Sequence, residues 1–194
     1  MRMLASERLR FDGWSREDHA SLYALHADPR VQRSYGPCPE KWSAAGITQR
    51  LDGYIAEQAR HGFTKWKLSL ADGTFVGRAG WSPWCEGTLE IGYALRPEFW
   101  GCGLGGEAAQ ALMDWAVATL PPWRLAGFAL THNVASQRIL SRIGMTFIDH
   151  RIIAGVENSY FEWVTPSPAC IAADAGWPAR SRSPESPSSR QPRS

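Results

Sequence analysis

The sequence predicts an α/β domain over residues 1–165, followed by a tail of different composition over residues 166–194. Three observations favour this fold class. The chain has 194 residues, of which 44% are hydrophobic and 21% are charged, so it can bury one sizeable core. Segments with the alternation of strands take turns with segments that have helical spacing. A glycine-rich turn in the middle of the chain joins a strand to a helix.

The first 62 residues predict one strand and two helices. The strand is expected over 8–14. Ser15 then has the character of a helix N-cap, and Asp18 completes a capping box three residues later. This helix should end near Ala27, because an Asp-Pro pair follows. A second helix is expected over 43–60, where apolar residues recur at helical spacing and a His-Gly pair follows.

The centre of the chain predicts three strands. Two of them, over 65–70 and 74–81, flank the turn Ala71-Asp72-Gly73, which is typical of a hairpin. The third is expected over 88–95 and alternates cleanly between two faces. One face carries Leu89, Ile91, Tyr93 and Leu95, and the other carries Thr88, Glu90, Gly92 and Ala94.

The last third predicts two helices and three strands. A helix over 107–119 should bury a stripe at helical spacing. A later helix has Asn133 as its N-cap and Gly144 beyond its end. The predicted stripe consists of Ala108, Ala111, Leu112, Trp115, Ala116 and Thr119. The predicted strands cover 124–130, 145–153 and 159–164, the last two as a closing hairpin.

The tail and the body differ in charge and composition. The tail holds six Pro and seven Ser, so we expect it to be disordered. Its four Arg and two acidic residues account for the whole net charge of +2, which leaves the body neutral. A neutral body argues against a nucleic acid or an anionic membrane as the main partner.

Cysteine usage and hydropathy indicate a reduced, cytoplasmic protein. The four cysteines are scattered without a CxxC pair, which predicts neither a disulfide framework nor a metal site. No apolar run approaches the length needed to span a bilayer, and the first residues lack the apolar region of a secretory signal.

The strongest functional signal is the glycine-rich turn with Gly101, Gly103, Gly105 and Gly106. A helix start offers free backbone N–H groups, and glycines let a pyrophosphate approach them closely. The spacing also fits a dinucleotide fingerprint, but the next strand ends in Ala-Leu-Thr-His and lacks the acidic residue that this reading requires. A turn that serves packing alone is the other alternative.

Three segments resemble the GNAT superfamily of acetyl-CoA-dependent N-acetyltransferases: the strand LEIGYAL, the loop RPEFWGCGLGGEA and the later NVASQRILSRIGM. The opening SERLRF and the segment ALHADPRV are similar to the ribosomal-protein N-terminal acetyltransferases of the RimJ/RimL type. The resemblance covers about Ser6–Val164. It implies a mixed, mostly antiparallel, twisted sheet of six or seven strands flanked by about four helices. It also implies acetyl transfer to a primary amine by direct attack on the thioester.

The resemblance implies a set of acetyl-CoA contacts. Leu95 and its strand would pair through the backbone with the pantetheine arm, as a peptide adds to a sheet edge. Trp100 departs from the superfamily pattern at the first loop position but suits the RimJ/RimL branch. Cys102 stands where that branch often has a basic residue, so one phosphate contact is missing. The expected cofactor-binding residues of the loop are Trp100, Gly101, Cys102, Gly103, Leu104, Gly105 and Gly106.

The same resemblance suggests how the thiolate of coenzyme A is protonated. An Asn at position 133 would bind the pantetheine region, and a Tyr seven residues later often acts as the acid. Here that position is Leu140, so the tyrosine is missing. Ser136, three residues after Asn133, is the candidate acid, because the resemblance to the RimJ/RimL branch implies a serine in this role. The alternative is that Asn133 is an N-cap and Ser136 an ordinary residue of the first turn.

Glu90 is the candidate base, because a strand glutamate in this family can deprotonate the amine through water. The alternative, which the sequence supports equally, is that Glu90 is a solvated or ion-paired strand carboxylate without a role in catalysis. An α-amine with a pKa near ~8 is about one-tenth neutral at pH 7, whereas a lysine amine near ~10.4 is neutral about once in 2,500. A weak base therefore favours an N-terminal amine as the acceptor.

Two rival functions stay open. The chain could acetylate a small amine such as an antibiotic, a polyamine or an amino acid, or it could bind acetyl-CoA with weak catalysis. The acceptor and the choice between monomer and homodimer are left open. Some of the tryptophans near the motif are expected in the core and some in the acceptor cleft. They are Trp81, Trp84, Trp100, Trp115 and Trp123.

Overall fold

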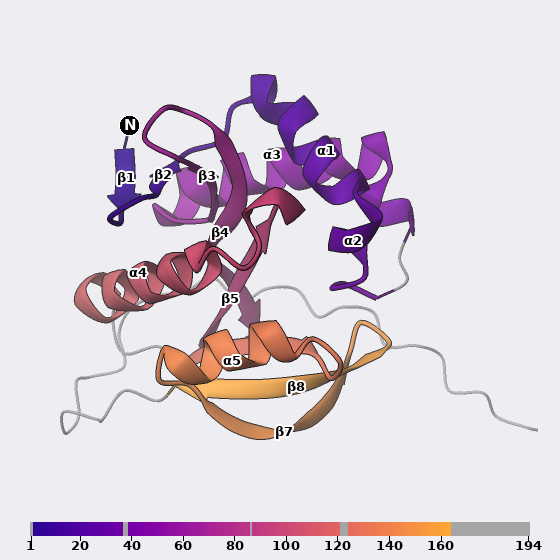
Figure 1. Cartoon of the computed structure of the whole chain (residues 1–194), viewed down its shortest axis with the longest axis vertical. Helices are drawn as coiled ribbons and strands as arrows, with labels where there is room; N and C mark the ends of the chain where they lie inside the picture. The colour runs from indigo at the N-terminus through magenta and orange to yellow at the C-terminus, as the bar shows by residue number, and fades with distance from the viewer. Residues whose placement is uncertain (1, 37–38, 86, 121–123, 164–194) are drawn as a thin grey trace, which may run out of the picture.

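One eight-stranded sheet organises the computed structural model, which describes residues 2–36, 39–85, 87–120 and 124–163 (Figure 1). The strand order is β1-β2-β3-β4-β5-β6-β8-β7, and within it only β5 and β6 pair in parallel. The strands are β1 (Arg2–Ala5), β2 (Arg10–Asp12), β3 (Lys65–Ser69), β4 (Phe75–Cys85), β5 (Thr88–Leu95), β6 (Arg124–Leu130), β7 (Thr146–Ile153) and β8 (Val156–Trp163). The α-helices are α1 (His19–Ala27), α2 (Pro29–Gln32), α3 (Ala44–His61), α4 (Leu104–Thr119) and α5 (Val134–Arg142).

The α/β class is confirmed, but the described residues form eight strands and five α-helices, more than the six or seven strands and about four helices expected. Strand β1 was missed and pairs with β2, which covers only three residues of the predicted 8–14. Helix α2 was missed because Pro29 ends α1 and also begins the next helix, where Asp28 accepts a hydrogen bond from the Arg30 N–H at 2.8 Å.

The predicted capping and turn signals are present. The Ser15 N–H donates to Asp18 at 2.9 Å, although the first turn is a 3₁₀ turn over Arg16–Asp18. Ser43 accepts the Gly46 N–H at the start of α3. The β3–β4 hairpin and strand β5 are confirmed, while β4 continues four residues beyond the predicted end at Trp81. The closing hairpin is also confirmed, with β8 beginning three residues earlier than predicted.

Helix α4 differs from the prediction in its start and in its buried face. It begins at Leu104, not at residue 107, so two of the loop glycines belong to its first turn. Thr119 is exposed, against the prediction. Because alanines and other apolar residues occur on every side of this helix, their spacing alone does not show which face of the helix is buried. The side chains that it buries are Leu104, Ala108, Ala109, Leu112, Met113 and Ala116.

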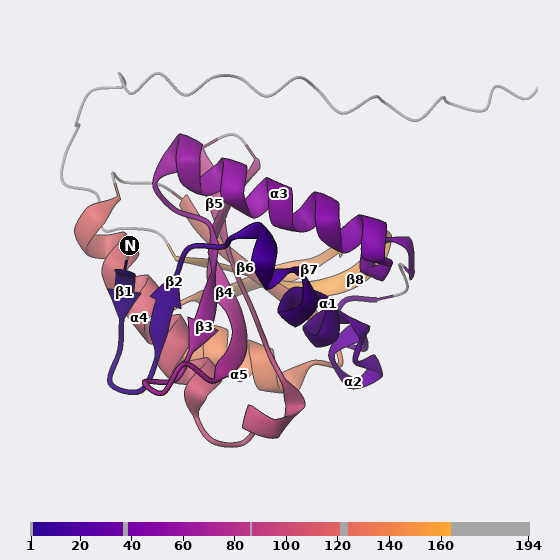
Figure 2. The same ribbon diagram turned by 90° about the horizontal axis from the view of Figure 1, so that it is seen from above.

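The helices cover the two faces of the sheet in separate groups (Figure 2). Helices α1–α3 lie over one face, where Leu25 and Val31 pack against Ala94 of β5. Helix α4 packs on the other face, where the buried Trp81 indole of β4 donates to the Leu112 main-chain oxygen at 3.0 Å. The predicted tail, 166–194, and Trp123 lie outside the described residues.

The sheet opens between its two parallel strands. Strands β5 and β6 pair from Thr88 with Arg124 to Ile91 with Gly127, and the pairing ends there. Strand β5 continues to Leu95 and β6 to Leu130 without pairing to each other. The divergence expected between these two segments is therefore confirmed, and it creates the opening in which the candidate site lies.

Candidate active site

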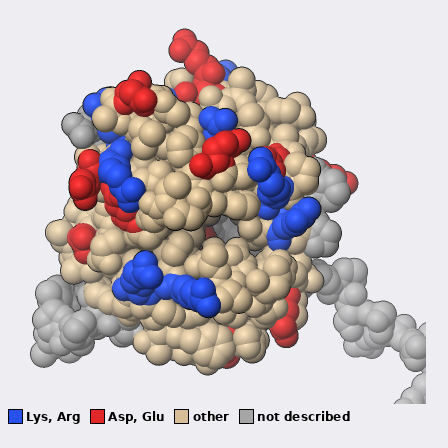
Figure 3. Space-filling model, viewed as in Figure 1, with Lys and Arg blue, Asp and Glu red and all other residues tan. Residues whose placement is uncertain are grey.

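A cleft of about 960 Å³ opens where β5 and β6 part. It reaches both faces of the sheet, because its walls include residues from the α4–α5 side and from the α1–α3 side. Figure 3, viewed as Figure 1, shows a hollow in the middle of the molecular surface, with Lys and Arg side chains on either side of it. Six basic residues and one acidic residue line it within the described chain: Lys41, Arg50, Lys65, Arg78, Arg138, Arg142 and Glu90.

The free edge of β5 turns backbone groups toward the cleft. The Arg96 N–H donates to the Val76 oxygen of the β4 segment at 2.8 Å. Because backbone groups alternate along an antiparallel strand, those of Tyr93 and Leu95 point the other way, to the side where β6 has diverged. The Trp100 indole N–H donates to the Leu95 oxygen at 2.8 Å. Leu95 therefore borders the cleft, with its carbonyl already bound once.

The glycine loop places a helix start at one end of the cleft. Gly101 and Gly103 have φ of 75° and 79°, the left-handed region that favours glycine. The first bond of α4 runs from the Glu107 N–H to the Gly103 oxygen at 3.0 Å, so the preceding N–H groups are outside the helix ladder. A Cβ on Gly105 would lie 3.3 Å from Ile139, which indicates a packing role against α5.

The loop glycines and Trp100 line the cleft, whereas the side chains of Cys102 and Leu104 do not. Leu104 is buried in the core, and the exposed Cys102 thiol contacts the Trp100 oxygen at 3.5 Å. These two residues can therefore offer only their backbone to a ligand in the cleft. Trp100 is 47% exposed, as a residue at the rim of an open site should be.

Two arginines missed by the sequence reasoning stand beside the loop. Arg138 and Arg142 extend from α5 to the cleft wall. The Arg142 guanidinium lies 3.9 Å from the position of a Cβ on Gly106. Arg142 thus brings positive charge close to the start of α4, and Arg138 adds to the positive charge of the cleft. The helical pattern of α5 alone could not show which of its sides faces α4.

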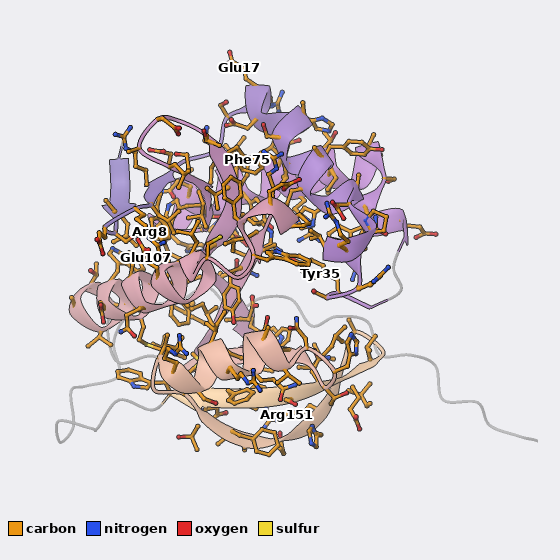
Figure 4. The ribbon with its side chains drawn as sticks, viewed as in Figure 1. Arg8, Glu17, Tyr35, Phe75, Glu107 and Arg151 are labelled. Carbon is orange, nitrogen blue, oxygen red and sulfur yellow. The ribbon has the colours of Figure 1, made fainter. Side chains whose placement is uncertain are left out.

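A polar network fixes the loop from the N-terminal side. Glu107 of α4 accepts hydrogen bonds from the Ser6 hydroxyl at 2.7 Å and from the Arg8 Nε at 2.6 Å (Figure 4). Arg8 also donates to the Cys102 oxygen at 3.1 Å. Burial alone would raise the pKa of Glu107, but the bonds from Ser6 and Arg8 outweigh it and lower that pKa. Glu107 thus stays anionic and holds Arg8 against the loop.

The predicted acid region lies at the start of α5. Asn133 is the N-cap, since its side-chain oxygen accepts the Ser136 N–H at 3.2 Å. Both residues line the cleft. The Tyr93 hydroxyl of β5 donates to the Ser136 main-chain oxygen at 3.1 Å, and burial raises the pKa of this phenol. Leu140, where the family tyrosine is expected, is buried in the core.

Glu90 lies in the cleft and is also ion-paired. Its carboxylate accepts a hydrogen bond from the Lys65 ammonium of β3, and the glutamate is 9% exposed. The Lys65 side chain crosses Gly92, where a Cβ would lie 2.6 Å from the Lys65 Cε. A side chain at position 92 would obstruct Lys65. Glycine there therefore lets the Lys65 side chain reach Glu90 from β3, two strands away. Lys65 was not foreseen from the sequence.

Arg78 of β4 and Arg50 of α3 form the far wall on the α1–α3 side. Arg78 is 3% exposed and donates to His26 at 3.2 Å and to the Tyr35 hydroxyl at 3.0 Å. Tyr35, labelled in Figure 4, is one of the residues that line the cleft. Burial, with Arg78 and Arg50 nearby, lowers the pKa of His26 to about 2, so this imidazole is neutral.

Three of the tryptophans expected near the motif, Trp81, Trp84 and Trp115, belong to the packing. Trp81 is fully buried, and Trp115 packs edge-on against Trp66 with ring centroids 5.2 Å apart. Trp84 packs against Phe128 and Tyr160. Within the described ranges, no cluster of three or more His, Cys, Asp or Glu could hold a metal ion. The helices described are also too short or too polar to cross a membrane.

Comparisons with known proteins point to one family. The acetyltransferase (GNAT) domain model matches residues 8–146. The chain is 25% identical over 175 residues to the uncharacterized N-acetyltransferase YjdG of Bacillus subtilis, a match that covers 84% of this chain and 98% of that protein.

Solved structures agree on the fold. An acetyltransferase from Salmonella typhimurium that modifies the N-terminal serine of a 50S ribosomal subunit protein has a TM-score of 0.70 at 18% identity, over 84% of this chain and 99% of that one. RimL, a ribosomal-protein α-N-acetyltransferase solved with coenzyme A, has a TM-score of 0.70 at 19% identity, over 84% of this chain and 98% of that one.

The domain match, the sheet that opens between β5 and β6, and the glycine loop at the start of α4 agree with one another. The resemblance found in the sequence is thereby confirmed at the level of the family, whose co-substrate is acetyl-CoA. The chain belongs to the GNAT acetyltransferases and is an acetyl-CoA-dependent N-acetyltransferase.

Proposed function

We propose that the protein acetylates the α-amine at the N-terminus of a protein or peptide. The observation that carries this proposal is the cleft that reaches both faces of the sheet at the β5–β6 opening. Acetyl-CoA can enter from the α4–α5 side and an acceptor from the α1–α3 side. The thioester and the amine then meet at the opening, where proximity lowers the barrier.

On the α4–α5 side of the cleft, most of the contacts proposed for acetyl-CoA are made by backbone groups. The free edge at Tyr93 and Leu95 can pair with the amides of the pantetheine arm. The pyrophosphate would lie at the loop from Gly101 to Gly106, where helix N–H groups favour anions. Arg138 and Arg142 supply the positive charge that Cys102 cannot. Asn133, at the cleft wall, is the candidate for the pantetheine region.

The proposed proton transfers use Glu90 and Ser136. Glu90 would take the proton of the attacking amine through water, with Lys65 holding its carboxylate in place. A backbone N–H of β5 between Gly92 and Leu95 would stabilise the developing oxyanion, and the strand alternation favours that of Tyr93. The Ser136 hydroxyl would protonate the departing thiolate.

The charge of the cleft supports a peptide acceptor over a polyamine or a cationic antibiotic. Polycationic acceptors need carboxylates, and the described lining has one acidic residue against six basic ones. An α-amine is also the easier amine to deprotonate, since its ordinary pKa near ~8 lies well below that of lysine. The Salmonella structural relative, which acts on an N-terminal serine, is consistent with this acceptor class.

A competition assay tests the proposal. The purified protein with acetyl-CoA is offered peptides with free N-termini, the same peptides with blocked N-termini and free lysines, and small amines, and the products are identified by mass spectrometry. We expect acetylation at α-amines. Acetylation of small amines alone would favour the rival acceptor class. Binding of acetyl-CoA with no acceptor turned over would favour the binding module.

A further inference from the structure

The acceptor side of the cleft contains a buried guanidinium without an anionic partner. Arg78 is 3% exposed, and its hydrogen bonds go to two neutral groups, the His26 ring and the Tyr35 hydroxyl. Its remaining terminal nitrogen, Nη1, is buried without a hydrogen bond. No described carboxylate forms an ion pair with it. Burying a charge in this way is costly unless an anion compensates it.

A second arginine on the same wall of the cleft also lacks an anionic partner. Arg50 of α3 donates weakly to the Tyr54 hydroxyl at 3.4 Å and stacks its guanidinium over Trp42 at 4.9 Å. Its Nε is buried without a hydrogen bond, and it too lacks an ion pair within the described chain. Tyr54 also lies 5.8 Å below the Arg78 guanidinium, so one phenol contacts both cations.

The one carboxylate in the described lining does not balance these charges. Glu90 forms its ion pair with Lys65 and also attracts Arg78 electrostatically, so one carboxylate faces three cations and this wall keeps a net positive charge at Arg50 and Arg78. The phosphates of acetyl-CoA cannot reach them through the loop, because that loop lies on the α4 face of the sheet. Arg78 and Ala94 are register partners whose side chains point to the opposite, α1–α3 face.

We infer that the acceptor carries a carboxylate, which binds between Arg50 and Arg78 while its amine lies at the β5–β6 opening. The spacing fits this arrangement. Arg78 is opposite Ala94, two residues along β5 from Gly92, which corresponds to about 7 Å. That distance suits an acidic side chain on the first or second residue of a peptide, or an acidic amino-acid derivative. The inference rests on the proposed function, since it names the acceptor class of the same site.

Matched acceptors that differ by one charge test the inference. The first pair is Ala-Glu-Ala-Gly and Ala-Gln-Ala-Gly as C-terminal amides, and the second is glutamic acid α-amide and glutamine α-amide. Within each pair the α-amine keeps nearly the same surroundings, so kcat/KM compares the carboxylate with the amide. We expect the acidic member to be favoured at least about tenfold in one pair or both, about 1.4 kcal/mol. If the acidic member is favoured in the peptide pair alone, the acceptor that carries the carboxylate is a peptide.

Substitution of the arginines links the preference to this wall. In Arg50→Gln the acid-over-amide ratio should fall close to one. Arg78→Gln should do the same, with its melting temperature and acetyl-CoA affinity measured because the residue is buried. Arg60→Gln is the matched control, since Arg60 is exposed on the same helix and outside the cleft, and the ratio should stay at the wild-type value.

Calorimetry with the same four acceptors on the protein loaded with coenzyme A gives a binding ratio that does not depend on turnover. A ratio near one in both kinetics and binding overturns the inference and leaves the proposed function intact. Absence of turnover together with tighter binding of the acidic members overturns the proposed function alone. A preference that survives in Arg50→Gln and in a folded Arg78→Gln also overturns the inference.

Discussion

The Tyr93 hydroxyl donates a hydrogen bond to the main-chain oxygen of Ser136, 3.1 Å away, and so joins β5 to α5 across the opening between β5 and β6. Burial raises the pKa of Tyr93, which keeps the phenol protonated and able to donate at neutral pH. The contact fixes the first turn of α5, where Asn133 and Ser136 face the cleft. It also places a tyrosine beside the candidate acid, although none occurs at position 140.

Ser136→Ala should lower turnover by ~10²-fold or more if the hydroxyl is the general acid. The substitution removes one hydroxyl and little volume, and the Tyr93 bond goes to the unchanged backbone. Binding of acetyl-CoA should therefore change little by calorimetry. Single-turnover kinetics should show the loss in the chemical step.

Tyr93→Phe is the matched comparison, because it removes the other hydroxyl next to the opening. The loss of one hydrogen bond should lower the free energy of unfolding by about 1 kcal/mol, and turnover should fall less than in Ser136→Ala. If Ser136→Ala keeps wild-type turnover and Tyr93→Phe loses it, the acid is Tyr93.

Gly103→Asp should weaken acetyl-CoA binding at least tenfold, about 1.4 kcal/mol. The new carboxylate would stand at the start of α4, against the pyrophosphate. Gly87→Asp controls for backbone strain, since Gly87 also has positive φ, at 66°, with open space around its Cβ, in the turn before β5. Unchanged affinity in a folded Gly103→Asp protein would remove the loop from the cofactor site.

Glu90→Gln should reduce kcat/KM, and its effect should grow as the pH falls. At lower pH a smaller share of the α-amine is neutral, so the reaction depends more on the base. The ratio of wild type to variant should therefore rise between about pH 8 and pH 6. A constant ratio over that range would indicate that Glu90 holds Lys65 in place and does not accept the proton.

His26 makes the free energy of unfolding pH-dependent. Its pKa is lowered to about 2 in the fold from the ordinary 6.5, so below pH 6.5 the unfolded chain takes up a proton that the folded protein refuses. Stability is thus fully present above pH 6.5 and falls with decreasing pH, by up to about 1.4 kcal/mol per unit from this group. Urea titrations of His26→Gln should show a shallower fall.

Removal of residues 166–194 should leave the melting temperature and the turnover unchanged. The segment holds six Pro and seven Ser and none of the motifs found in the sequence. Thermal unfolding and steady-state assays of the shortened and full chains check this. A drop of several degrees would show that Ile171 or Trp177 contributes to the packed domain.

The sequence by itself determined the features that depend on neighbours along the chain. The cap at Asn133, the limits of β5, and the glycine turn before α4 follow from side-chain periodicity and backbone freedom within a few residues. The family resemblance rests on these same short segments. The start of α4 and its buried arc were less well predicted, because a helix that is apolar on several sides fits more than one packing face.

Only the tertiary structure decided which distant residues meet at the opening. Lys65 reaches Glu90 because β3, β4 and β5 pair in a register that aligns it with two glycines, at Gly80 and Gly92. The contacts of Arg50 and Arg78 with Tyr54, and of Tyr93 with Ser136, depend likewise on how helices pack over the sheet. Strand register and helix packing are set by the whole core, so no local pattern could have predicted these contacts.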